Sequence, residues 1–131
     1  MIVVTPLFAA VFTLMYLGLS INVIRQRLAN KVSLGDGGHS GLRIAIRTHA
    51  NFFEYVPFIL VLMWFIETLT FSSSTVFWMG SFLLIARIFH VLGMLYPRKL
   101  PILRQLGMIG TFAVMVKAAL ALFQYYIPIS I

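Results

Sequence analysis

Four long apolar segments constrain the fold of this chain more than any other feature of its sequence. They cover about residues 3–24, 42–69, 75–95 and 101–127, and a helix needs about 20 apolar residues to cross a bilayer. Charged residues make up only 10% of the chain, against roughly 25% in soluble domains. So few charges cannot cover the surface of a water-soluble domain. The sequence therefore predicts an all-α integral membrane protein, with residues 1–131 forming a single four-helix bundle.

The basic residues predict how the chain is oriented in the membrane. Seven of the ten lie in or beside two polar links: Arg25, Arg27, Lys31, Arg43, Arg98, Lys99 and Arg104. The serine-rich turn at 71–74 and both chain ends carry none. Cytoplasmic loops hold an excess of Lys and Arg, so both basic links are expected in the cytoplasm and both termini outside. This placement also argues against nucleic acid, which the net charge of +7 would otherwise suggest as a partner.

Metal and thiol chemistry within the chain are not expected. There is no cysteine, and the three histidines show no metal-ligand spacing, so no metal site is predicted. The glycine-rich stretch at 35–38 has two interpretations, a phosphate-binding loop or a flexible turn. A P-loop is longer, ends in Lys-Ser/Thr and follows a strand, so the flexible turn is favoured.

A polar stripe interrupts the second apolar segment. Arg47, Asn51 and Glu54 are four and three residues apart, so they share one face of a helix, with Tyr55 at its flank. A carboxylate at bilayer depth is costly, so Glu54 should have a cationic partner, either Arg47 or Arg87. Two interpretations remain open. The stripe is either a structural ion-pair network or a site where arginines hold an anionic ligand.

The third segment carries a second polar face. Arg87 and His90 are three residues apart, and an antiparallel third helix would bring them toward the stripe. A lone histidine in a membrane more often bonds across helices than catalyses a reaction. Glu67 and Lys117 are expected to snorkel or to pair with each other, because a proton relay would need a longer chain of ionisable groups.

At these residues the chain resembles the MAPEG family, the membrane-associated proteins in eicosanoid and glutathione metabolism. The pattern Arg-x3-Asn-x2-Glu-Tyr-x-Pro stands at 47–57, and Ala-Arg-Ile-aromatic-His stands at 86–90. The resemblance extends over essentially the whole chain, and the glycine-rich link is similar to a bacterial branch of the family.

The resemblance implies a homotrimer in the bacterial inner membrane, with both termini in the periplasm. It implies a transferase or peroxidase that joins glutathione to an apolar electrophile or reduces a lipid hydroperoxide. Glutathione would bind between subunits on the cytoplasmic side. The glutathione-binding residues assigned by position are Arg27, Arg47, Asn51, Glu54, Tyr55, Arg87 and His90. The catalytic assignment is Arg104, which would stabilise the glutathione thiolate, with Arg98 as a rival.

Some residues depart from the family's eicosanoid-metabolising members. Those members have tyrosines where His90 and Met94 stand here, and an arginine where Leu28 stands. These differences argue against an eicosanoid substrate. The alternative function is a non-catalytic membrane scaffold, or a binding protein for lipids or small thiols. A transporter is less supported, because the sequence shows neither an inverted repeat nor paired Gly/Pro interruptions.

Overall fold

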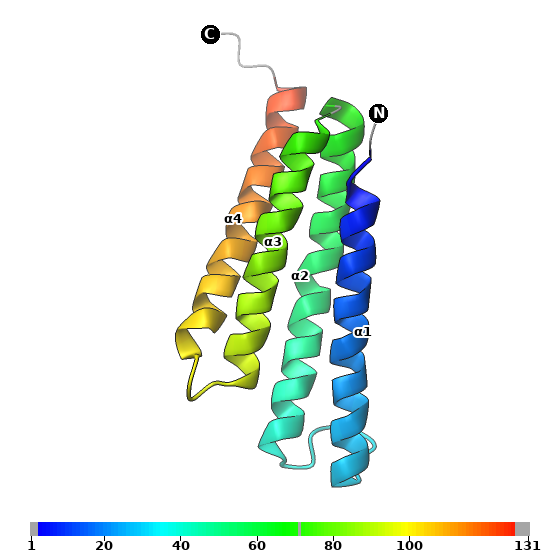
Figure 1. Ribbon diagram of the computed structural model, residues 1–131, viewed down its shortest axis with the longest axis vertical. Helices are drawn as coiled ribbons and strands as arrows, with labels where there is room; N and C mark the ends of the chain where they lie inside the picture. Colours follow the sequence, from blue (N-terminus) through cyan, green and yellow to red (C-terminus); the bar gives the residue numbers. More distant parts are fainter. Residues whose placement is uncertain (1–2, 71, 128–131) are drawn as a thin grey trace.

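The computed structural model describes residues 3–70 and 72–127, and four helices make up nearly all of this part of the chain (Figure 1). The helices are α1 (Thr5–Asn30), α2 (Ser40–Thr70), α3 (Ser73–Leu95) and α4 (Pro101–Tyr126). Each is long and apolar enough to cross a membrane, and the described residues form no strand. The predicted all-α membrane four-helix bundle is confirmed.

The four helices run alternately up and down. In Figure 1 the start of α1, the α2–α3 turn and the end of α4 lie at one end of the bundle. The links at 31–39 and 96–100 lie at the other, which we call the basic end. The helix α2 packs against all three others, and α3 and α4 pack most extensively of all. The polar stripe of α2 lies toward the basic end, and its Asn51 contacts Arg87 of α3.

The first helix extends beyond its apolar segment. The apolar segment was predicted to end near residue 24, whereas α1 continues to Asn30 and ends where Lys31 adopts a left-handed conformation with φ of 54°. The backbone N–H of Val32 donates to the Arg27 carbonyl oxygen at 3.1 Å, which caps the helix, and the side chain of Arg27 donates to the carbonyl oxygens of Val32 (3.4 Å) and Gly35 (2.8 Å) in the link. A helix ends where a cap satisfies its last carbonyl groups, not where its apolar residues run out.

The glycine-rich link is a tight turn. All three of its glycines have positive φ, at 67°, 55° and 79° for Gly35, Gly37 and Gly38. The Asp36 carboxylate accepts the Gly38 N–H at 2.9 Å and pairs with the Arg43 guanidinium at 2.5 Å. The hydrogen bond from Arg43 lowers the pKa of Asp36 below its ordinary value. The carboxylate therefore folds the link onto α2, which fits the favoured interpretation of this stretch as a turn.

Glycines bring α3 and α4 into backbone contact near the basic end. A Cβ atom on Gly107 would lie 2.5 Å from the Ala86 carbonyl oxygen and 2.5 Å from the backbone nitrogen of His90. A Cβ atom on Gly93 would collide with the backbone of Arg104. Small residues permit such close approach between membrane helices. This contact sets the position of Arg104 beside His90.

Glu67 holds the start of α1. Its side chain is fully buried, and its two carboxylate oxygens accept the backbone N–H groups of Val4 (2.6 Å) and Thr5 (2.8 Å). The expectation that Glu67 snorkels or pairs with Lys117 is therefore wrong. An α-helix begins with unpaired N–H groups and a partial positive charge, and a carboxylate from a neighbouring helix satisfies both.

Candidate functional site

A polar cavity of about 300 Å³ opens between α2, α3 and α4 near the basic end. Its lining residues are Arg47 and Asn51 of α2, His90 and Met94 of α3, and Arg104, Gln105 and Met108 of α4. Four residues assigned from the sequence thus line one cavity, although they are far apart along the chain. We call this the arginine cavity.

Arg87 forms the buried wall behind this cavity. It is fully buried, and its Nη2 donates to the Asn51 Oδ1 at 2.7 Å. Its Nη1 lies 3.4 Å from the Thr111 hydroxyl and 3.8 Å from the Met108 sulfur. The bond to Asn51 confirms that the polar face of α3 meets the stripe of α2. Since the Thr111 hydroxyl donates to the Gly107 carbonyl at 2.7 Å, its oxygen is left to accept from Arg87.

No carboxylate neutralises Arg87 within the described residues. The chain has three acidic side chains, and all three are engaged elsewhere. Asp36 pairs with Arg43, Glu67 binds the start of α1, and Glu54 lies 3.7 Å from Arg47. Among the residues that the structure describes, the guanidinium of Arg87 has only neutral partners, and its buried Nε has no hydrogen-bond partner. The arginine cavity therefore carries an excess of positive charge.

The position of Arg87 also fixes the protonation of His90. The Arg87 Nη2 lies 3.3 Å from the His90 Nδ1, and an arginine N–H can only donate. Nδ1 must then be the acceptor, so the proton of the neutral imidazole is on Nε2. Because His90 lines the cavity, Nε2–H is the group that it can offer to a ligand.

Glu54 and Tyr55 flank the cavity. Glu54 pairs with Arg47, the first of the two partners predicted for it, and both side chains are about half exposed. The ring of Tyr55 lies edge-on against Phe112 of α4, with 5.6 Å between the ring centres. Both residues therefore lie on the α2 face next to the cavity.

Arg27 and Arg98 lie away from this cavity. Arg27 is near the end of α1, where its guanidinium caps the link at 31–39. Arg98 is exposed in the link between α3 and α4, whereas Arg104 lines the cavity. Of these two rivals, only Arg104 is among the residues that line the arginine cavity.

Sequence reasoning missed three members of the site, namely Gln105, Met108 and Thr111. Thr111 lies seven residues, about two helical turns, after Arg104 and so shares its face of α4. A search for a polar stripe on the fourth segment would have found this spacing. Gln105 and Met108 have no such signal, because glutamine and methionine are common on many kinds of helix surface.

A second polar cluster joins α1 and α2. The His49 Nε2 lies 3.1 Å from the Ser20 hydroxyl, and the His49 ring stacks on Tyr16 with 4.6 Å between ring centres. The Ser20 hydroxyl donates to the Tyr16 carbonyl, so it can only accept from His49. A serine that accepts is not poised as a nucleophile, and the cluster acts as a link between two helices. No group of three metal-ligating side chains occurs in the described part of the chain.

Comparison with known proteins now identifies the family. The model of the MAPEG family matches residues 5–124, which include α1, α2, α3 and all but the last two residues of α4. The chain belongs to the MAPEG family. This MAPEG protein is 36% identical over 118 residues to Inner membrane protein YecN of Escherichia coli K12, covering 90% of this chain and 88% of YecN. The YecN of Escherichia coli O6:H1 matches to the same extent. No solved structure matches the chain.

Proposed function

We propose that this MAPEG protein is a glutathione-dependent transferase or peroxidase of the bacterial inner membrane. The observation that carries the proposal is the arginine cavity, which Arg47 and Arg104 line, and behind which the buried Arg87 has no carboxylate partner among the described residues. A cavity with surplus positive charge suits a ligand with several negative groups. The relatives named YecN are inner membrane proteins, which supports this location.

Glutathione carries negative groups that would balance the surplus positive charge of the arginine cavity. It carries two carboxylates, one ammonium group and a thiol that becomes negative on ionisation. Arg47 and Asn51 would bind a carboxylate, and Glu54 would face the ammonium group in place of its present partner. A pairing at 3.7 Å between two half-exposed side chains is weak, so a ligand can displace it at little cost.

Arg104 would supply the chemistry. A free thiol has a pKa of about 8.5, and a neighbouring cation lowers it by stabilising the thiolate. The thiol proton would leave to water at the mouth of the cavity. The sulfur lone pair then forms a carbon–sulfur bond to an aromatic halide, and the halide leaves with the electrons of the bond that breaks. The Nε2–H of His90 would donate a hydrogen bond to the ligand.

A homotrimer is part of the proposal. Arg27 lies outside the arginine cavity of its own chain, so its assigned contact with glutathione would come from a neighbouring subunit. An apolar electrophile or lipid hydroperoxide would enter from the membrane lipid. Large apolar side chains such as Leu14 and Phe123, with 70% and 61% of their surface exposed, show that the bundle offers extensive apolar surface to its surroundings.

Conjugation of glutathione to an aromatic halide by the purified protein tests the function. We expect activity in the wild type, and a loss of roughly 10²-fold in Arg104→Met, the size found when one stabilising donor is removed from an active site. Arg98→Met is the matched control and should keep wild-type activity. Equal rates for the wild type, Glu54→Gln and Arg104→Met would refute the site.

A second candidate is a non-catalytic binder of lipids or small thiols. The observation that favours it is that Arg87 already has four partners within its own chain. A thermal-shift titration separates the two, because a ligand that binds only the folded protein raises its unfolding midpoint. Stabilisation by glutathione together with turnover supports the enzyme, whereas stabilisation without turnover supports the binder.

A further inference from the structure

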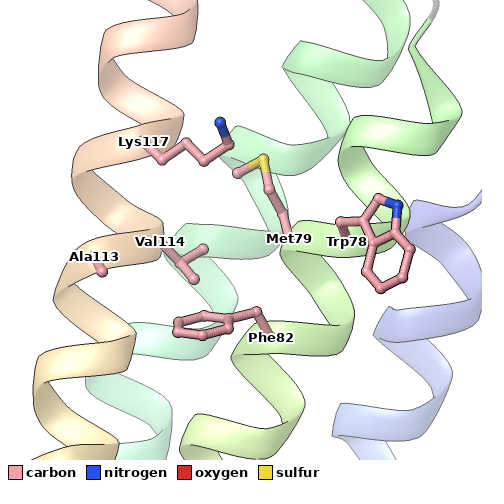
Figure 2. Close-up of a pocket in the computed structure, with 6 residues that line it drawn as sticks. All are labelled: Trp78, Met79, Phe82, Ala113, Val114 and Lys117. Carbon is pink, nitrogen blue, oxygen red and sulfur yellow. The ribbon is translucent and has the colours of Figure 1, made fainter.

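A second cavity lies on the opposite side of the α3–α4 pair, toward the end of the bundle away from the basic links. It is a groove of about 360 Å³ between the two helices. Its lining residues are Trp78, Met79 and Phe82 of α3, and Ala113, Val114 and Lys117 of α4 (Figure 2). We call it the Lys117 groove. Five of its six lining side chains are apolar, and one is a cation.

This groove is separate from the arginine cavity. Along α4, Ala113 is nine residues after Arg104, and Lys117 is nine residues after Met108. At 3.6 residues per turn, nine residues amount to about two and a half turns, so each pair lies on opposite sides of the helix. A ligand in one cavity cannot reach the other without crossing α4.

Lys117 has no anionic partner within residues 3–70 and 72–127, the part of the chain that the structure describes. Its ammonium group makes no hydrogen bond or ion pair with the described residues, and all three acidic side chains are engaged elsewhere. Figure 2 shows the side chain extended from α4 across the groove toward Met79 of α3. An unpaired charge among apolar groups at membrane depth is costly, so this ammonium group favours an anion from outside the chain.

Depth and volume select the kind of anion. Lys117 lies nine residues, or about 14 Å along the helix axis, before Tyr126 at the end of α4. Tyr125 and Tyr126 suit the aromatic belt at the membrane surface. The phosphate of a phospholipid stays at that surface, whereas the groove lies deeper. A phospholipid also has two hydrocarbon chains, and the groove's volume is at the small end of the roughly 300–1,000 Å³ typical of ligand sites. Depth and volume therefore favour a ligand with one chain over a phospholipid.

We propose that the Lys117 groove binds an anionic amphiphile with a single chain, a long-chain carboxylate. Its carboxylate pairs with the Lys117 ammonium group, and its hydrocarbon chain lies against Trp78, Phe82 and Val114. The proposal does not depend on glutathione chemistry, because it concerns a different face of the bundle.

The groove contains its own reporter, because Trp78 is one of the chain's two tryptophans and Trp64 is the other. In a Trp64→Phe background, a long-chain fatty acid brominated along its chain should quench the fluorescence of Trp78 saturably. The methyl ester of the same acid has no charge, and we expect it to bind about tenfold more weakly, as for the loss of one charge-assisted contact.

The variants and competitors decide the outcome. Lys117→Met should remove the preference for acid over ester, and Lys117→Arg should keep it. The matched control Lys99→Met removes a lysine from the basic end and should change nothing. Equal quenching by acid and ester in the folded Trp64→Phe protein would overturn the proposal. It would also be overturned if a phosphatidylglycerol competed as well as the acid, or if Lys117→Met changed the oligomer mass because a second copy fills the groove.

Discussion

Replacing Arg87 by methionine separates a binding role from a structural one. Methionine keeps much of the length of the side chain and removes the guanidinium. In the free protein the change loses one good hydrogen bond, to Asn51 at 2.7 Å, and longer contacts to Thr111 and His90 at 3.4 and 3.3 Å. It also removes a fully buried cation that has no carboxylate partner among the described residues.

These two effects oppose each other in the free energy of unfolding. A hydrogen bond to a charged group contributes about 1.5–3 kcal/mol, and the longer contacts contribute less. Burying a charge costs several kcal/mol, and apolar replacements of buried ionic groups are often neutral or stabilising by about 1–4 kcal/mol. We therefore expect Arg87→Met to unfold within about 1 kcal/mol of the wild type, or to be more stable.

Ligand binding should change in the opposite direction. Loss of the same 1.5–3 kcal/mol from a charge-assisted contact weakens the Kd for glutathione by about 10- to 150-fold. At a glutathione concentration of about 100 times the wild-type Kd, the ligand stabilises the wild type by about 2.7 kcal/mol, and this falls to about 1.4 kcal/mol or less in the variant.

The assay is thermal unfolding of the purified protein in detergent, with and without glutathione. Arg98→Met is the matched control, because it removes an exposed arginine outside the arginine cavity. It should leave both the midpoint and the shift unchanged. A large fall in the midpoint of Arg87→Met together with an intact glutathione shift would refute the reasoning, because Arg87 would then be a structural member of the bundle.

Three further predictions test the framework around the cavity. Gly107→Ala should lower the free energy of unfolding by about 1–3 kcal/mol, as in an overpacked core, and reduce conjugation, because the added Cβ pushes α4 away from α3. The control Gly18→Ala should keep both stability and activity, because nothing lies within 4 Å of its added Cβ. Glu67→Gln should lower the free energy of unfolding by about 1–3 kcal/mol, because one backbone N–H at the start of α1 loses its acceptor. The rise in unfolding midpoint caused by glutathione should remain. Because the pKa of Asp36 is lowered, its contribution is present above the ordinary value of about 3.9 and is lost as the pH falls through the lowered pKa. Protease cleavage at 31–39 should therefore increase in acid and in Asp36→Asn, and an unchanged cleavage rate in that variant would contradict this.

The sequence alone determined the class of this protein and the register of its polar stripe. Four apolar segments of this length are unfavourable in water, and each is long enough to cross a bilayer. Within lipid the backbone N–H and C=O groups must hydrogen-bond to one another, so length and composition predict four membrane helices. The spacing of Arg47, Asn51 and Glu54 placed them on one face, because the helical repeat is fixed. The family resemblance rested on the same residues, and the family match confirmed it.

Only the tertiary structure decided which side chains meet. Nothing in the sequence near Glu67 indicates that it holds the start of α1, 62 residues away. The contribution of Thr111 to the wall behind the cavity, and the choice of Arg104 over Arg98, depend on glycines that set how closely α4 approaches α3. Likewise, only the placement of all three acidic side chains shows that Lys117 has no carboxylate partner among the described residues. Helical spacing fixes neighbours within a helix, whereas contacts between helices depend on packing distance, and that distance is a property of the assembled bundle.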